Sequence, residues 1–527
     1  MSDRLQEIIK AVIEKCTGRA ASPIDGRVSG AAVCVVDSSA FATAAGILKE
    51  AGFRLFAEWA SDESGSGRGF GVYAAYNEGP DYLLIKAELP SIDPSFPTIT
   101  GYYPGAYRLE RQIESLMGIK PQGHPDLRPW IKHEDWPSDA YPLRKTFDAS
   151  KPLGRVDGDY GWAKAEGEGV FEIAVGPVHA GIIEPGHFRF QSVGEDIINL
   201  ETRFGYVHKG IEKRFESLTW EAAVRLAGRV SGDSTVAHAV AFCMAVEQAS
   251  GCVPPDRAMY LRAAMIEMER IGNHLGDIGA ICNDAAFAFL HYQFSILREK
   301  ILRANKQAFG HRLMMDRIVL GGVSVDITIK RVEAVISVLE EVSVAFERLV
   351  RIYEDNPSLE DRVYGTGILK PEIAKALGVV GFVARSSGQR LDARLQNPFL
   401  PYNKIVPNVP CLSSGDVHAR AWVRIEEVRE SFRLVREMLI VLPAGPIVSP
   451  WTPPEPDSTG LSVVEGWRGE IVYWVQSDNE TGINRCMVRD PSSMNWLAIE
   501  QAIRGNIVPD FPLCNKSFNQ SYSGHDL

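Results

Sequence analysis

Residues 256–285, DRAMYLRAAMIEMERIGNHLGDIGAICNDA, carry the pattern that decides the fold class. The apolar residues of this stretch recur at helical spacing, at Leu261, Met265, Met268, Leu275 and Cys282. Spacing of three, four or seven residues is typical of an α-helix with one buried face. The stretch is therefore predicted to form one long helix that packs against others through its apolar side.

Two further stretches repeat this helical periodicity. The first set is Val335, Leu339, Val342, Phe346, Leu349 and Tyr353. The second set is Val428, Phe432, Val435 and Leu439. Several long amphipathic helices favour a bundle, in which functional sites are built from side chains on facing helices. Residues 160–527 are therefore expected to form a large, mainly α-helical bundle domain with minor β-structure.

The first 148 residues show a different pattern. Apolar or alternating runs at residues 31–36, 54–59, 72–76 and 82–88 predict strands. A helix is expected near residues 108–117, and residues 119–160, rich in Pro, Gly, His and Asp, are expected to form an extended arm. The sequence thus predicts an α+β fold, with a small N-terminal α/β domain over residues 1–148 before the helical bundle domain.

Composition excludes several classes of protein. The 527 residues include 56 Lys+Arg and 67 Asp+Glu, a net charge of −11, which argues against a nucleic-acid partner. No apolar stretch approaches the roughly 20 residues of a membrane span. Eight dispersed cysteines without a CxxC pair indicate reduced thiols in the cytoplasm and no metal or iron–sulfur ligand set by spacing. No strand-linked GxGxxG motif predicts an NAD site.

A polar stripe follows the long helix. Arg270, Asn273, Asp277 and Asp284 lie within about 60° of one another on a helical wheel, away from the apolar residues. This stripe can be a solvated face. It can equally be a polar seam inside the bundle, where Asp277 and Asp284 would have perturbed pKa values and relay protons. Periodicity leaves both interpretations open.

Residues 176–190, GPVHAGIIEPGHFRF, place His179, Glu184 and His187 within nine positions. Glycines and prolines favour a tight loop that could direct these side chains to one point. Imidazole and carboxyl groups are suited to proton transfer near neutral pH. The alternative is a polar turn between two strands.

Two more segments carry polar clusters. Residues 229–238, RVSGDSTVAH, include Arg229, Asp233 and His238 and have an S-x-x-S spacing, which is also common where serines cap a helix. Residues 515–527, NKSFNQSYSGHDL, form a polar C-terminal tail, a kind of segment that is often frayed.

Motifs spread over nearly the whole chain resemble two peripheral-arm subunits of respiratory complex I. Arg111, residues 123–128 (GHPDLR) and residues 142–145 (PLRK) resemble the smaller hydrophilic subunit. The motifs that resemble the quinone-site subunit are residues 205–213 (GYVHKGIEK), 269–275 (ERIGNHL), 385–388 (RSSG) with Asp392 and Arg394, and Gly415-Asp416 with Arg420. The fusion of both modules, the 176–190 run and the NKSF tail look closest to the large subunits of hydrogenase-4 and formate hydrogenlyase, which are membrane-bound [NiFe]-hydrogenases.

The resemblance implies a nickel site whose ligands this chain lacks. In the hydrogenases four cysteines bind the metal, and their positions are occupied here by Ser231, Ser234, Ser521 and Gly524. A serine hydroxyl is a harder ligand than a thiolate, and glycine supplies none. No metal and no other cofactor is therefore expected on this chain.

Proton-handling positions of the family are retained. The resemblance matches Glu184 to a proton-transfer glutamate, His179 to the histidine that contacts quinone, and Asp284 to a buried aspartate, whereas Gly232 replaces the quinone-binding tyrosine. Glu184, His179, Asp284 and Asp277 are therefore the expected catalytic residues. The residues expected to line the cavity are His187, Arg229, Ser231, Asp233, Ser234, His238 and Ser521.

The resemblance implies a redox subunit of a membrane-associated complex. Electrons would come from a [4Fe–4S] cluster in a partner iron–sulfur subunit and reach an acceptor, a quinone, while NAD(H) would be used only by other subunits. A ferredoxin-like subunit and membrane ion-translocating subunits would be further partners, and the chain would lie on the cytoplasmic side of the membrane. The alternatives are a non-catalytic coupling subunit and an active [NiFe]-hydrogenase with non-thiolate ligands.

Overall fold

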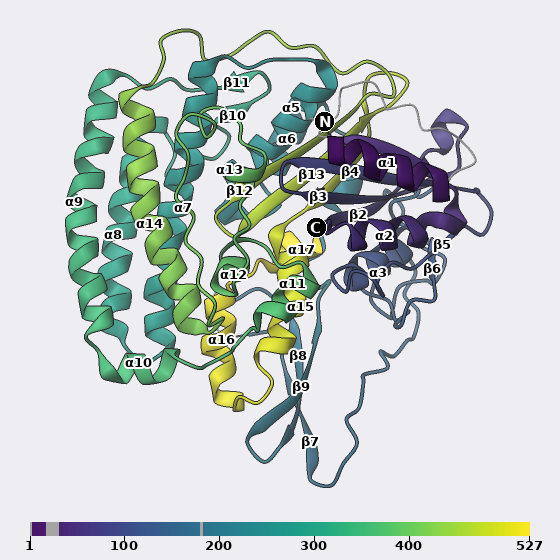
Figure 1. Cartoon of the computed structure of the whole chain (residues 1–527), viewed down its shortest axis with the longest axis horizontal. Helices are drawn as coiled ribbons and strands as arrows, with labels where there is room; N and C mark the ends of the chain where they lie inside the picture. Colours follow the sequence, from purple (N-terminus) through teal and green to yellow (C-terminus); the bar gives the residue numbers. More distant parts are fainter. Residues whose placement is uncertain (1–2, 17–30, 180–182) are drawn as a thin grey trace.

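A computed structural model describes residues 3–16, 31–179 and 183–527 of the chain. Part of the predicted 176–190 loop, residues 180–182, lies outside the described residues. The architecture is a four-stranded mixed sheet with helices at one end of the molecule and a bundle of long helices at the other (Figure 1). The expected α+β class is confirmed. None of the described helices is both long and apolar enough to cross a bilayer.

The N-terminal sheet has strand order β1-β4-β3-β2. β1 (Ala32–Val36) runs parallel to β4 (Asp81–Leu89), while β3 (Phe70–Glu78) pairs antiparallel with β4 and with β2 (Arg54–Asp62). Alternate residues of each strand point to opposite faces. One face packs on the helices α1 (Asp3–Cys16), α2 (Phe41–Glu50) and α3 (Ala106–Met117).

A second sheet separates this module from the helices. It contains β12 (Thr459–Gly466), β13 (Gly469–Ser477) and β14 (Ile483–Arg489), all antiparallel. On β13, Tyr473 and Val475 join the core of the helical bundle, whereas Val472 and Trp474 join a cluster with Trp59 and Tyr73 of the first sheet. Because successive side chains of β13 point to opposite faces of the sheet, this one strand contributes to the cores of both halves of the molecule.

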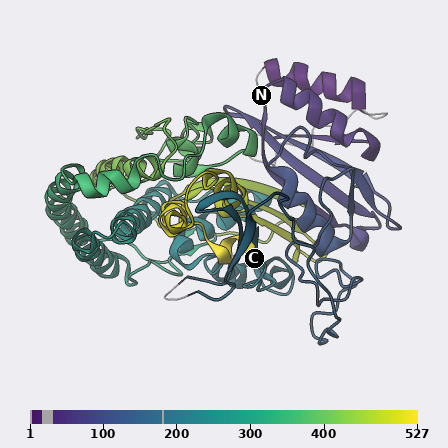
Figure 2. The same cartoon turned by 90° about the horizontal axis from the view of Figure 1, so that it is seen from below.

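The bundle consists of long helices that include the three predicted ones (Figures 1 and 2). They are α6 (Thr235–Ser250), α7 (Asp256–Asp284), α8 (Ala288–Phe309), α9 (Ile329–Glu354) and α14 (Val417–Ile440). The shorter helices are α4 (Ile211–Phe215), α5 (Trp220–Ala227), α10 (Pro357–Val363), α11 (Pro371–Leu377), α12 (Gly381–Ser386), α13 (Ala393–Gln396), α15 (Pro491–Ala502), α16 (Phe511–Phe518) and α17 (Tyr522–Asp526).

Smaller sheets complete the fold. Strands β7 (Val170–Val175), β8 (His187–Val193) and β9 (Asp196–Arg203) form an antiparallel sheet that projects from the body of the molecule (Figure 1). Two pairs of short strands are β5 (Ser95–Pro97) with β6 (Lys120–Gln122), and β10 (Ile318–Val319) with β11 (Gly322–Val323).

The predicted arm, residues 119–160, begins with β6 and then continues without helix or strand, and it contacts the large domain at β9 and just after α4. Its Trp130 is buried, and the carbonyl oxygen of Trp130 accepts a hydrogen bond from Arg203. Further along the arm, Lys145 pairs with Glu216 at 2.9 Å. The arm thus fastens the small module to the large one. The domain boundaries at 148 and 160 stay a prediction.

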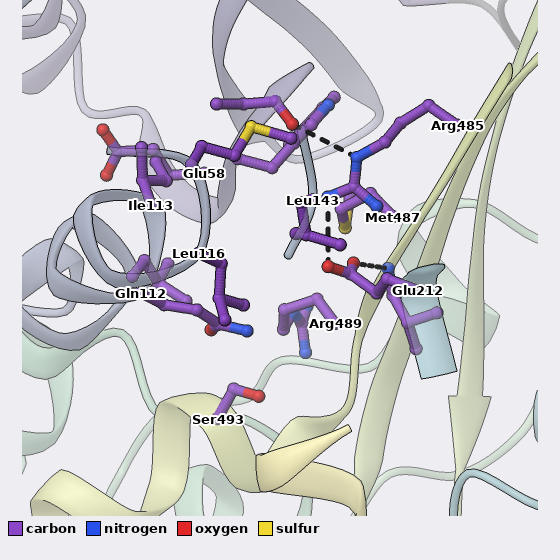
Figure 3. A pocket seen from close by; sticks show the side chains of 15 residues that line it. Glu58, Gln112, Ile113, Leu116, Leu143, Glu212, Arg485, Met487, Arg489 and Ser493 are labelled. Atoms are coloured by element: carbon purple, nitrogen blue, oxygen red, sulfur yellow. Dashed lines mark hydrogen bonds and ion pairs between the residues drawn. The ribbon is translucent and has the colours of Figure 1, made fainter. Parts of the chain in front are cut away.

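A small cavity of about 30 Å³ lies where β2 and α3 of the small module meet β14 (Figure 3). Glu58, Gln112 and Arg489 are among the polar side chains that line it. Glu58 is only 5% exposed, and neither carboxyl oxygen has a hydrogen-bond partner among the described residues. Burial, together with the nearby Glu110, raises the pKa of Glu58 well above its usual value.

We expect Glu58→Gln to stabilise the fold at neutral and alkaline pH. The pKa of Glu58 is higher in the folded chain than in the unfolded chain. Its contribution to the free energy of unfolding is therefore fully present below the unfolded pKa near 4.3 and is lost as pH rises. Between the unfolded and the folded pKa of Glu58, the free energy of unfolding falls by about 1.4 kcal/mol per pH unit. Urea resistance by pulse proteolysis at pH 4.5, 6 and 7.5 should show a gain that grows with pH, and exposed Glu88→Gln should not. A difference in stability between Glu58→Gln and wild type that does not change with pH would contradict a buried, protonated Glu58.

Candidate active site

The four positions that the sequence resemblance matches to nickel ligands lie close together in the folded chain. Ser231 and Ser234 begin the segment that leads into α6, and Ser521 precedes α17. The hydroxyl oxygens of Ser231 and Ser521 lie 2.8 Å apart, and Ser521 accepts a hydrogen bond of 2.8 Å from the amide of Gly524. Neither Ser231 nor Ser234 caps a helix through its side chain, so the capping alternative is wrong.

An ion pair fills the space beside these serines. Arg468, in the turn between β12 and β13, donates to both carboxylate oxygens of Asp233 at 2.6 and 2.7 Å. The guanidinium also comes within 3.5 Å of the hydroxyls of Ser231 and Ser234. The Arg468 side chain is 4% exposed and that of Asp233 is 38% exposed. Arg468 is therefore buried, whereas Asp233 faces an opening.

Arg468 keeps Asp233 ionised. Burial alone would favour the protonated carboxyl, but the charge and hydrogen bonds of Arg468 hold the pKa of Asp233 below its usual value. Sequence reasoning missed Arg468. Its only local signal is a charged side chain between Gly466, Trp467 and Gly469 in a tight turn.

His238 and Asp490 form a hydrogen-bonded pair next to the serine positions. The Nε2 atom of His238 lies 3.0 Å from Asp490, and Nδ1 lies 3.0 Å from the hydroxyl of Tyr473. Although burial opposes it, the contact with His238 lowers the pKa of Asp490 to about 2. The Asp490 carboxylate packs against Gly524, where an added Cβ would lie 2.6 Å from it. Gly524 is thus required by packing with Asp490.

These residues do not fit a nickel–iron centre. The four positions offer hydroxyl groups and a backbone, whereas such a centre requires soft thiolates. The hydroxyls of Ser231 and Ser521 bond to each other, and Arg468 brings a positive charge to their side. A cationic side chain beside the ligand positions opposes the binding of a metal cation.

The polar stripe of the long helix lies largely inside the protein. Arg270 and Asp277 are buried, and Asn273 and Asp284 are half-buried. Asp277 pairs with Arg424 at 3.0 Å and accepts a hydrogen bond of 2.6 Å from Asn519. The solvated-face alternative is therefore wrong for Arg270 and Asp277. At the end of α7, burial raises the pKa of Asp284.

The predicted loop residues lie over the C-terminal segment. Glu184 is exposed and accepts a hydrogen bond of 3.0 Å from the amide of Ser523, which brings it close to Ser521. His179 contacts the carbonyl of Gly186 at 2.7 Å. The C-terminal tail is not frayed, since Ser521 and its successors are largely buried.

Of the predicted site residues, Arg229 lies apart from the serines and His187 is held neutral. Arg229 forms an exposed ion pair with Asp316 at 2.8 Å and does not reach the serines. His187 is buried on β8, where its Nδ1 atom lies 3.2 Å from the carbonyl of Gly176, and burial lowers its pKa. His187 is therefore neutral at physiological pH.

A narrow cavity of about 10 Å³ lies on the other side of Asp233. Its lining residues are Gly232, Asp233, Met268, Glu269, Gly272, Asn273, Arg298, Leu302, Asn305, Arg312, Leu313 and Met314. Glu269 accepts hydrogen bonds from the amides of Val236 and Ala237 at 2.7 and 3.2 Å. Burial raises the pKa of Glu269 to about 8 despite these bonds, with Asp233 adding to the shift.

Glu269 is a second residue that sequence reasoning missed as a site residue. Its signal was present, because Glu269 lies four residues before Asn273 and so falls on the same helical stripe. The carboxyl group of Glu269 holds its proton below about pH 8 and lies in the same cavity as the ionised Asp233. The arrangement can bind a small polar molecule and supply it with a proton.

Comparison with known proteins identifies the class of this chain. Residues 284–454 and 451–526 match the family model described as respiratory-chain NADH dehydrogenase, 49 Kd subunit. Residues 34–153 match the model of the 30 Kd subunit of the same enzyme. The chain thus joins two peripheral subunits of complex I type in one polypeptide.

Formate hydrogenlyase subunit 5 of Escherichia coli (strain K12) is 31% identical over 450 residues, covering 84% of this chain and 79% of the relative. Hydrogenase-4 component G of the same organism is 31% identical, with 86% and 80% covered. The C/D component of the NADH-quinone oxidoreductase of Phocaeicola vulgatus is 31% identical, with 73% and 78% covered. The chain belongs to the family of these fused 30-kDa and 49-kDa type subunits, and the resemblance expected from the sequence is confirmed.

A solved structure has the same fold. It is a chain of the membrane-bound sulfane sulfur reductase, an archaeal respiratory membrane complex. The TM-score is 0.64 at 24% sequence identity, covering 68% of this chain and 99% of that chain.

Proposed function

We propose that the chain is a redox subunit of a membrane-associated, complex I-like oxidoreductase and that an acceptor, a quinone, is reduced beside Asp233. The observation that carries the proposal is the placement of the ionised Asp233 and the protonated Glu269 on the lining of one narrow cavity. Met268, Leu302 and Met314 give this cavity apolar walls, and Asn273 supplies a polar group.

Reduction of a quinone to a quinol takes up two electrons and two protons. The electrons would come from a [4Fe–4S] cluster of a partner iron–sulfur subunit, fed in turn by a ferredoxin-like subunit, because this chain has no thiolate set for a cluster. Glu269 would donate one proton, since it is protonated at neutral pH and borders the cavity. Glu184, Asp277 and Asp284 would resupply protons from the surface and from the seam of α7.

The assembly around this chain is part of the same proposal. Membrane ion-translocating subunits would hold it at the cytoplasmic side of the membrane as a peripheral subunit. NAD(H), if used at all, would be oxidised by other subunits, and this chain would bind no cofactor of its own. Electron flux from a reduced low-potential donor to a soluble quinone analogue, measured on the purified complex, tests the proposal. Flux to other acceptors only would refute quinone as the acceptor.

Glu269→Gln provides a sharper test. We expect flux through the wild-type complex to fall as pH rises through about 8, because Glu269 then loses its proton. In the Gln variant this alkaline limb should be absent and flux at pH 7 about 10²-fold lower, the scale for losing a positioned acid. Exposed Glu340→Gln is the matched control. An unchanged alkaline limb in the Gln variant would show that another group supplies the proton.

A second candidate function is that of a non-catalytic coupling subunit. It is favoured by the contacts at the positions predicted to correspond to metal ligands, where Arg468 pairs with Asp233 and the hydroxyls of Ser231 and Ser521 bond to each other. Such a subunit would transmit changes of charge through Asp233–Arg468 and Asp277–Arg424 to ion-transporting partners. Electron flux would then be insensitive to substitutions at Asp233 and Glu269, whereas ion translocation would be lost.

A further inference from the structure

A stack of aromatic rings lies at the end of the bundle near α10. The ring centroids of Tyr364 and His418 are 4.0 Å apart with an interplanar angle of 17°. His418 is followed in the stack by Trp422 at 5.8 Å and 22°. Tyr353 lies beneath, with its centroid 6.0 Å from that of His418. Three elements, α9, the end of α10 and α14, therefore contribute nearly parallel rings to one place on the surface.

These rings line an open pocket of about 330 Å³ with an acidic rim. Glu354 and Glu360 are exposed lining residues. The arginines near the pocket are engaged elsewhere, Arg362 with Asp510 and Arg429 with Glu347. Burial lowers the pKa of His418, so this ring adds no positive charge at neutral pH. The lining residues therefore combine π-faces with two carboxylates and contain no basic partner for them.

A neighbouring contact within the chain shows that a guanidinium group suits this aromatic stack. Arg429 lies over Trp422, 5.7 Å from the ring centroid, while two of its nitrogens pair with the two carboxylate oxygens of Glu347 at 2.8 Å. Trp422 thus has a guanidinium on it. Tyr364, which also stacks on His418, is 50% exposed, and no such cation lies over its ring in the described residues.

We propose that this pocket is a docking site for an arginine side chain of a partner polypeptide. A planar guanidinium stacks on an aromatic face and pairs with a carboxylate through two parallel hydrogen bonds, which an ammonium group cannot match. Tyr364 would supply the face, and Glu354 and Glu360 would supply the carboxylates. The inference requires that the chain is part of a multisubunit complex, but it is independent of the identity of the acceptor.

Photocrosslinking in the native complex tests the occupant. A photoreactive phenylalanine analogue at position 364, in the tagged full chain expressed in its host, should crosslink to one segment of another subunit that contains an arginine. A crosslink to a segment without arginine, an adduct to lipid, or the absence of any crosslink to a partner would overturn the proposal.

Affinity measurements test the chemistry. We expect Tyr364→Ala and Glu360→Gln each to weaken binding of the crosslinked partner protein about ten-fold, the range of a desolvated cation–π or charge-assisted contact. Tyr364→Phe, which keeps the ring, should bind like wild type. Tyr292→Ala, an equally large change at a 66% exposed tyrosine on α8, and Glu340→Gln are the matched controls. Equal losses in test and control variants would refute the site, and unchanged electron flux per assembled complex would separate it from the redox proposal.

Discussion

Replacing Asp233 by asparagine is expected to lower electron flux through the assembled complex by about 10²-fold or more, the scale for losing a positioned charged group at a reaction site. The substitution keeps the shape of the side chain but removes the charge that neutralises Arg468. Arg468 is 4% exposed and would be left as an unpaired buried cation beside the cavity. The flux is measured from a reduced low-potential donor to a quinone analogue, with complex assembly checked in parallel.

Asp316→Asn is the control for this experiment. It also breaks an arginine–aspartate pair, with Arg229, but both partners are about 40% exposed and lie away from the serines. We expect near wild-type flux in the control. Unchanged flux in Asp233→Asn, with loss of ion translocation, would instead support the coupling-subunit alternative, because that role needs the charge but no local reduction.

Replacing Arg385 by leucine is expected to destabilise the fold by about 3–5 kcal/mol, the usual cost of breaking a buried ion pair. Arg385, on α12, contacts Glu427 at 2.7 Å, Glu465 at 2.9 Å and Asp392 at 3.4 Å. All four side chains are at most 2% exposed. Without the guanidinium, Asp392 still pairs with Arg394 and Glu427 with His274, whereas Glu465 loses its ion pair, so protonation of Glu465 is favoured.

Urea resistance of the chain by pulse proteolysis measures this loss, and the deficit should grow as pH rises. Burial and Asp392 already raise the pKa of Glu465 to about 7 with Arg385 in place, so its protonation is close to balance at neutral pH. Arg433→Leu, which breaks partly exposed contacts with Glu430 and Glu437, should cost less than about 1 kcal/mol. Equal losses in both variants would show that Arg385 acts through packing alone.

The periodicity of the sequence predicted the secondary structure well. The helix expected over residues 256–285 is α7, Asp256–Asp284, and the strand expected over residues 82–88 is β4, Asp81–Leu89. These patterns depend on which faces of a helix or strand are apolar, and that information is local. Complete motifs in order also predicted the family, which the comparisons confirm.

The candidate site was predictable only in part. Ser231, Asp233, Ser234 and Ser521 were identified from the sequence because they occupy motif positions, and the structure brings them together. Arg468 and Glu269 were not identified as site residues. Arg468 comes from a turn of the second sheet, more than 200 positions from Ser231 in the chain, and no local pattern indicates what that turn faces.

The sequence by itself determined the helices, the strands and the family, because each of these depends on residue types and their spacing along the chain. Only the tertiary structure decided that the polar stripe of α7 is internal, that Arg468 pairs with Asp233, and that the C-terminal tail is buried. The physical reason is that a charged side chain is tolerated inside a protein only when a partner from another segment neutralises it. Arg424 does this for Asp277, and Arg468 for Asp233, and these partners are chosen by packing across the whole chain.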